Sequence, residues 1–410
     1  MLPRLAPFCL GLLSILPVPA THAAADWLQF RGPASTAVSE TGQIPETPTI
    51  DWSVPLPGRG LSSPILVGDR LFVTCSSGSR QDLLELLCLE TNTGKTLWRR
   101  ALRATGRTMT YPKTSVAAPS PCSDGKRVFA TWSCNDVAAF DLEGTLLWTR
   151  GITADYPNVS NSLGMASSPL VIGNTLVVMV ENDSESYSLG LDVRSGRNLW
   201  KLDRPKAANW TSPVLWQPSP DARPAALLQS SKGLTAVDAS TGSVLWDFQG
   251  NASSMSSCVV SGTRIFAPAG GITALQPAPD GAPPVSLWNS RQLNPSTTSP
   301  VLIAGLLLTT NNAGVLTAGS PEDGAVRWKQ RLTGPFSATP VGAGNRILAV
   351  SEKGLVQVVE VSPAEAKPLG QLQLPLQEDT KELILSTPAL RGNHAYIRTD
   401  STLWRIGSGR

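Results

Sequence analysis

A short pattern recurs along the chain and limits the folds that it can adopt. Counted from Ala236, it reads Ala-x-Asp-x-x-Thr-Gly-x-x-x-Trp and ends at Trp246. Glycine can take the positive φ of a hairpin turn, the aspartate can bond the turn backbone, and the indole offers a large apolar surface. Each copy therefore predicts two short strands joined by a tight turn. Complete or degenerate copies end at Trp98, Trp148, Trp200, Trp246, Trp288 and Trp328, and Trp52 lies in a last strand that has no first strand before it.

A second element precedes the copies. It consists of two small, mostly hydroxyl-bearing residues that are usually followed by proline, and it occurs eight times. Its second residues are Ser63, Ser120, Ser168, Ser212, Ser257, Ser299, Thr339 and Thr387. With a β-branched strand such as 175–179 between the two elements, each unit has four strands, called A to D in chain order. Tryptophans 98 to 328 follow one another at 40 to 52 residues, a period typical of a β-propeller blade.

The two ends of the repeat region predict how the ring closes. The region begins with a lone D strand around Trp52 and finishes with A, B and C strands at 387–388, 394–398 and 403–406. Pairing these ends in one sheet removes the open seam between the first and last blades. The sequence therefore predicts an all-β fold over residues 50–410, an eight-bladed β-propeller with four-stranded antiparallel blades.

Two segments precede the propeller. Residues 1–23 have the charged start, apolar stretch and small-residue cleavage site of an export signal. Residues 24–49 form a leader that we expect to pack on the propeller surface, where truncating Trp27 should cost much less than truncating a repeat tryptophan. No later segment is apolar for long enough to cross a bilayer. We therefore expect an exported monomer, periplasmic or extracellular.

Composition narrows the possible partners. The net charge is only +3 and the chain has no basic run, so nucleic acid is not expected as a partner. Five cysteines remain after the signal, and we expect buried thiols with at most one disulfide. They are Cys75, Cys88, Cys122, Cys134 and Cys258.

The repeat pattern, the eight blades and the terminal strands resemble the PQQ-like β-propeller superfamily over residues 50–407. That superfamily contains quinoprotein alcohol dehydrogenases and the non-catalytic propeller of the outer-membrane β-barrel assembly machinery, and the chain is closer in character to the latter. The resemblance to the enzymes implies PQQ, calcium, a catalytic aspartate and often a disulfide between adjacent cysteines. No two cysteines of this chain are adjacent, and Asp141, Asp192 and Asp238 occupy the turn position of the repeat.

His394 is the only histidine after the signal, and it is expected at a turn. The sequence therefore predicts no catalytic residue, no metal ligand and no cofactor, and it favours a protein that is not an enzyme.

Two surfaces are candidates for binding. The long connections 99–116, 150–166, 76–83 and 182–188 all emerge on one face, and long loops on a rigid scaffold often carry binding residues. The cationic and aromatic candidates there are Arg103, Arg107, Tyr111, Lys113, Tyr156 and Asn158. The second candidate is the ring of hydroxyl residues that begins the A strands, which we expect innermost at the channel mouth. These hydroxyls either only satisfy strand-end backbone groups or, with the 107–113 loop, form a polar docking site for a peptide or small ligand.

Three functional hypotheses follow. The first is an exported, non-catalytic scaffold that binds a protein or peptide partner in the cell envelope. The second is a PQQ- and calcium-dependent quinoprotein oxidoreductase, and the third is a propeller that binds a glycan or a small ligand.

Overall fold

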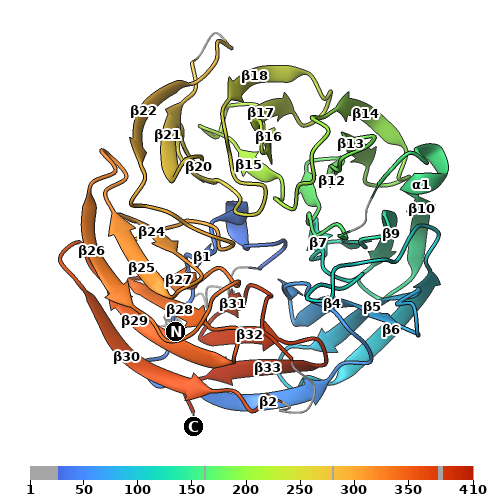
Figure 1. Cartoon of the computed structure of the whole chain (residues 1–410). Coiled ribbons are helices and arrows are strands. Elements are labelled where there is room, and N and C mark those ends of the chain that lie inside the picture. The colour runs from blue at the N-terminus through green and yellow to red at the C-terminus, as the bar shows by residue number, and fades with distance from the viewer. Residues whose placement is uncertain (1–25, 161–162, 279–280, 377–381, 410) are drawn as a thin grey trace, which may run out of the picture.

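The computed structural model describes residues 26–160, 163–278, 281–376 and 382–409. The expected export signal, residues 1–23, and the turn residue Asp280 lie outside these ranges. The described chain is a ring of eight sheets around a central axis, with each A strand nearest the axis and each D strand at the rim (Figure 1). The predicted all-β, eight-bladed propeller is confirmed.

The blades follow one another in chain order, each written from strand A to strand D. Blade 1 comprises β3 (Ile65–Val67), β4 (Arg70–Ser77), β5 (Leu83–Glu90) and β6 (Thr96–Arg103). Blade 2 comprises β7 (Cys122–Ser123), β8 (Arg127–Thr131), β9 (Asp136–Asp141) and β10 (Leu146–Gly151). Blade 3 comprises β11 (Leu170–Ile172), β12 (Thr175–Val180), β13 (Tyr187–Asp192) and β14 (Asn198–Asp203). Blade 4 comprises β15 (Val214–Trp216), β16 (Ala225–Ser230), β17 (Gly233–Asp238) and β18 (Val244–Gln249).

The second half of the ring is built in the same way. Blade 5 comprises β19 (Val259–Ser261), β20 (Arg264–Pro268), β21 (Ile272–Gln276) and β22 (Val285–Ser290). Blade 6 comprises β23 (Val301–Ile303), β24 (Leu306–Thr310), β25 (Val315–Gly319) and β26 (Val326–Arg331). Blade 7 comprises β27 (Val341–Ala343), β28 (Arg346–Val350), β29 (Leu355–Val361) and β30 (Ala366–Gln373). Blade 8 comprises β31 (Ala389–Arg391), β32 (His394–Arg398), β33 (Thr402–Gly407) and β2 (Thr49–Pro55).

Blade 8 closes the ring with strands from both ends of the chain. Strand β2 pairs antiparallel with β33, and Trp52 lies opposite Arg405 while Ser53 lies opposite Trp404. This pairing confirms the predicted closure.

The hydrophobic core lies between the blades. The B and C strands are covered on both faces by neighbouring sheets, so β4 is buried from Leu71 to Ser76 without alternation. The D strands form the rim and keep mostly exposed side chains, as in β6. One cluster joins Phe72 and Cys88 of blade 1 to Val128 and Phe140 of blade 2. Adjacent blades therefore share their apolar surface, and each depends on its neighbours.

The repeat tryptophans connect consecutive blades. The Nε1–H of Trp98 donates to the carbonyl oxygen of Leu142 in the next blade at 2.9 Å. Trp52, Trp148, Trp200, Trp288 and Trp328 make the equivalent bond at 2.8 to 3.3 Å. Trp246 Nε1 has no partner within the described ranges, and the neighbouring turn contains the undescribed Asp280.

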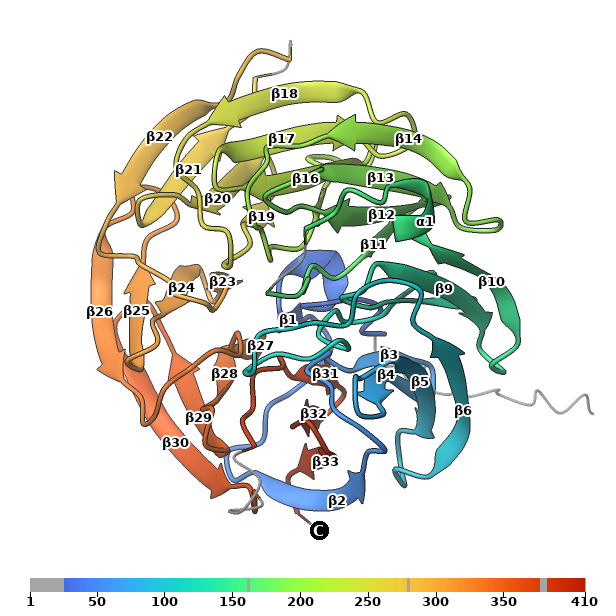
Figure 2. The ribbon, with the colours of Figure 1, turned by 45° about the vertical axis from the view of Figure 1, so that its right-hand side comes forward.

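Residues 26–39 of the leader lie within the ring of A strands (Figure 2), and not on the outer surface where the leader was expected. Trp27 is only 1% exposed and its backbone pairs with Leu66 of β3. Farther along, the leader forms the 3-10 helix η1 (Pro33–Ser35), and β1 (Val38–Ser39) pairs parallel with β27 of blade 7. A surface position for Trp27 is therefore wrong, because its indole is part of the core between blades, while the cost of truncating it stays a prediction.

Two further observations complete the fold. All five cysteines of the described chain are free and buried, so none forms a disulfide. The one α-helix in the described ranges is α1 (Ile152–Asp155), and no helix there has the length and apolar character to cross a bilayer.

Candidate functional site

A cup of about 550 Å³ lies on the propeller axis and opens on the face of the D-to-A connections. The leader contributes Phe30 to its lining. The eight predicted hydroxyl residues, from Ser63 in blade 1 to Thr387 in blade 8, all line this cup. Because one such residue begins each A strand, the hydroxyls form a ring inside the cup.

This hydroxyl ring ties each blade to the next. The backbone N–H of Ser63 donates to the Oγ of Ser120 at 2.8 Å, and the N–H of Ser120 donates to the Oγ of Ser168 at 3.0 Å. The same bond recurs from Ser168 to Ser212, Ser257, Ser299, Thr339 and Thr387, at 2.9 to 3.2 Å. Seven of the eight hydroxyls, from Ser120 to Thr387, thus accept the backbone N–H of the preceding blade. Their role in binding a ligand stays a prediction.

Four of the residues just before a ring position bond within their own blade: Ser62, Thr211, Thr298 and Ser386. Ser62 Oγ donates to the carbonyl oxygen of Thr74, and Thr211 Oγ1 donates to that of Gln229 at 2.9 Å, both within one blade. Successive side chains in an extended segment point to opposite sides. In these four blades the first hydroxyl of the pair therefore bonds inside its own blade, while the second faces the cup. Ser167 and Ser256 Oγ have no partner within the described ranges.

The same alternation adds a second ring, which the sequence reasoning missed. Every residue two positions before a hydroxyl of the ring also lines the cup. These residues are Leu61, Ala118, Ala166, Trp210, Met255, Thr297, Ser337 and Leu385. They come earlier in each A segment and so lie nearer the opening. This upper ring is apolar in blades 1 to 5 and in blade 8, and polar in blades 6 and 7.

Among the described residues, two charged side chains line the cup. Lys113 Nζ, from the connection between blades 1 and 2, lies 3.6 Å from Glu352 Oε2 of blade 7. Ser337 Oγ also donates to Glu352 Oε1 at 2.6 Å. The two charges compensate each other at the rim of the cup.

The structure separates the six predicted loop residues. Tyr111 and Lys113 line the cup, and the Tyr111 N–H donates to the carbonyl oxygen of Leu163 at 3.1 Å. The other four do not line it. Arg103 ends β6 and pairs with Asp82, Arg107 is exposed on its loop, and Tyr156 and Asn158 contact Tyr187 and Glu185 of blade 3.

The residues of the cup do not fit PQQ with calcium. PQQ is a planar tricarboxylic acid, yet among the described residues Lys113 is the only cationic one that lines the cup, and it already faces Glu352. The described residues contain no group of three or more His, Cys, Asp or Glu that could hold a metal ion. Calcium requires several oxygen ligands, commonly including carboxylates.

The conspicuous aspartates and the histidine have structural partners outside the cup. The Ser240 hydroxyl donates to Asp238 and holds its pKa below the ordinary value, and Ser195 does the same for Asp192. His394 lies in the closing blade, where Arg405 Nη2 is 2.6 Å from its Nε2.

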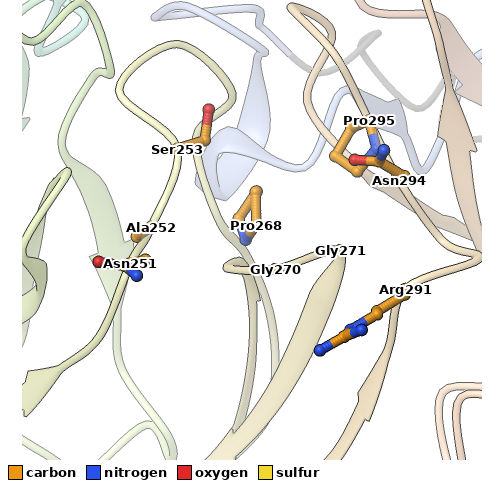
Figure 3. Close-up of a pocket in the computed structure, with 9 residues that line it drawn as sticks. All are labelled: Asn251, Ala252, Ser253, Pro268, Gly270, Gly271, Arg291, Asn294 and Pro295. Carbon is orange, nitrogen blue, oxygen red and sulfur yellow. The ribbon is translucent and has the colours of Figure 1, made fainter.

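A second cavity, of about 640 Å³, lies beside blade 5. Its walls are loop segments with Gly270, Gly271, Pro268 and Pro295, and Arg291 is the one charged side chain among the nine lining residues (Figure 3). It offers no converging polar groups comparable with the hydroxyl ring.

The fold and the cup define a plugged β-propeller with a cavity on its axis. The chain belongs to the family described as outer membrane protein assembly factor BamB, whose sequence model matches residues 45–210, 86–267, 188–298 and 268–406.

The similar proteins include dehydrogenases and a BamB structure. A polyvinylalcohol dehydrogenase from Sphingopyxis sp. (strain 113P3) is 25% identical over 296 residues, 60% of this chain and 42% of that protein. The chain thus spans less than half the length of this relative. The structure of BamB from Moraxella catarrhalis has a TM-score of 0.62, 16% identity, and coverage of 88% of this chain and 98% of that one.

A quinohemoprotein alcohol dehydrogenase from Comamonas testosteroni has a TM-score of 0.68 and 12% identity, with 94% of this chain and 81% of that chain covered. Likeness at these identities shows the fold alone.

Proposed function

We propose that the protein is an exported, non-catalytic propeller that binds a protein or peptide partner in the cell envelope through the cup. One observation carries this proposal: two stacked rings of side chains, mostly apolar above and hydroxyl-bearing below, line a single cavity on the axis. Pockets that combine an apolar wall with a few placed polar groups are typical binding sites. Membership of the BamB family supports a partner in outer-membrane assembly.

A pull-down from envelope extract tests the proposal with a matched pair of variants. Met255, in the upper ring, is 50% exposed, and Met109, which does not line the cup, is 57% exposed. Met255→Arg should abolish capture of the partner, whereas Met109→Arg should leave it unchanged. Equal capture by both folded variants would move the binding surface away from the cup.

A PQQ-dependent oxidoreductase is the second candidate, because a relative is named polyvinylalcohol dehydrogenase. The purified protein is titrated with PQQ and calcium. No stoichiometric quinone spectrum and no dye-linked alcohol oxidation are expected. Their appearance would replace the binding proposal by an enzymatic one.

A further inference from the structure

We propose that the cup recognises the free C-terminal carboxylate of a peptide, with the carboxylate at the hydroxyl ring and the last side chain against the upper ring. This inference rests on the proposed function and names the chemical group that the cup binds. Three features support it: hydrogen-bond donors in the ring, buried cations behind the wall of the cup, and a closed inner end.

The hydroxyl ring supplies O–H groups whose protons are not yet hydrogen-bonded. From Ser120 to Thr387, seven ring hydroxyls each accept a backbone N–H, and none donates its own proton to an acceptor within the described ranges. Because these hydroxyls line the cup, their protons can be donated to a group inside it. An ionised carboxylate only accepts hydrogen bonds, and bonds to an ionised acceptor are stronger than neutral ones.

Two fully buried guanidinium groups lie next to this ring. Arg31 Nη1 donates to the carbonyl oxygen of Cys258 at 2.9 Å, and Cys258 directly follows a ring serine. Arg398 Nη1 donates to Ser62 Oγ at 3.0 Å and to the Thr74 carbonyl oxygen at 2.7 Å, and Ser62 directly precedes Ser63 of the ring.

Neither guanidinium has a carboxylate within 4.0 Å among the described residues. By contrast, the buried Arg204 pairs with Glu181 at 2.7 Å. Burial lowers the pKa of Arg31 to about 10, so it is still protonated at neutral pH. Neither Arg31 nor Arg398 lines the cup, so their charges act on the cavity only as a field. Such a field in a low-dielectric wall favours one anionic group there, but it supplies no direct ion pair for a polyanion such as PQQ.

The leader closes the inner end of the cup. Trp27 pairs with Leu66, three residues beyond Ser63 in the A strand of blade 1, and Phe30 lines the cup. A chain cannot pass through a channel that is plugged in this way, whereas the end of a chain can enter it. The apolar upper ring, with Trp210 and Met255, suits a large terminal side chain. A C-terminus therefore matches the site better than a carboxylate in the middle of a chain.

Isothermal titration of the mature protein tests the inference with three N-acetylated peptides. The first is Gly-Ser-Gly-Leu-Phe with a free carboxylate, the second is its C-terminal amide, and the third is the amide with Glu in place of Leu. The free acid should bind at least about tenfold more tightly than the plain amide, in the range of a charge-assisted hydrogen bond. Raising the salt concentration should weaken the binding of the free acid and leave the binding of the plain amide unchanged.

A matched pair of variants locates the carboxylate. Thr339→Ser keeps the ring hydroxyl and should preserve the preference for the acid, whereas the isosteric Thr339→Val should reduce it. Because Thr339→Val also removes the acceptor of the Ser299 N–H, its folding is verified by melting before titration. Unchanged preference in the folded valine variant would overturn the assignment to the ring.

The peptide series separates failure of this inference from failure of the proposed function. Equal binding of acid and amide overturns the carboxylate inference and leaves peptide binding intact. Tight binding of the Glu-containing amide overturns the choice of a chain end. If no peptide binds, the inference falls, and the fate of the proposed function is decided by the pull-down with Met255→Arg.

Discussion

Gly242 shows how one residue serves two blades at once. Its φ of +73° fits the hairpin turn of blade 4. A Cβ added at this position would also lie 2.6 Å from Cγ of Trp200, the repeat tryptophan of blade 3. The repeat pattern predicted the turn but not this contact, because a single-chain pattern does not reveal what lies against it. The Thr-Gly turn of one blade is therefore part of the tryptophan site of the blade before it.

Replacing Gly242 by alanine tests this contact against a matched glycine. Gly262 also has a positive φ, +56°, but nothing lies within 4 Å of its added Cβ. We expect Gly262→Ala to cost about 1–2 kcal/mol for the left-handed backbone. Gly242→Ala should cost about 1–3 kcal/mol more, because the methyl group overpacks against the indole. Chemical denaturation measures both free energies of unfolding, and equal losses would contradict the contact.

His394 gives the closing blade a predicted pH dependence. Burial lowers the pKa of His394 from 6.5, and nearby Arg405 lowers it further, whereas Asp51 opposes the shift. Between the lowered folded value and 6.5 the unfolded chain binds more protons, so the free energy of unfolding rises with pH there. This stabilisation is complete above about 6.5 and is lost as pH falls through the folded pKa.

Thermal melts between pH 7.5 and 5.5 measure this effect. The wild type should lose more stability over that interval than His394→Gln, which cannot titrate. An identical loss in both proteins would show that His394 does not contribute.

At the scale of elements, repetition decided what the sequence could predict. The strands, the closing pair and the hydroxyl positions each recur around the ring, so their periodicity identified them. The upper ring was also accessible, since Trp210 and Met255 stand two residues before Ser212 and Ser257 and so share their side of an extended segment. No single residue type is common to all eight positions of that ring, so no repeat pattern indicated it. Arg398 was missed because its role depends on packing between blades 8 and 1.

The leader is the element for which the expectation failed. It occurs once, so no repeat indicates its place, and its prolines and polar residues are typical of a surface segment. Trp27 is nonetheless 1% exposed within the core cluster. Trp27→Ala should therefore cost about 3–5 kcal/mol, the range for large aromatic deletions and the same range expected for Trp246→Ala. Denaturation of both variants measures this, and a much smaller loss at Trp27 would place the leader outside the channel.

At the scale of the whole molecule, stability depends on a strand from each end of the chain. Blade 8 joins β2 to β33, and Tyr396 of its B strand packs against Trp52 of β2 at 6.1 Å between ring centroids. Because each blade buries its faces against its neighbours, an open seam exposes apolar surface in both flanking blades. Loss of β2 should therefore destabilise the ring as a unit.

Deleting residues 45–58, which include β2, tests this closure. The free energy of unfolding should fall by at least the ~3–5 kcal/mol of one large aromatic deletion, since Trp52 is removed together with its strand. Removing residues 408–410 is the control, because β33 ends at Gly407 and keeps its pairing with β2. Hydrogen exchange should then report lost protection in blades 1 and 7 as well as blade 8 for the first variant alone. A deletion variant that melts like the full chain would show that the ring does not depend on the terminal strand.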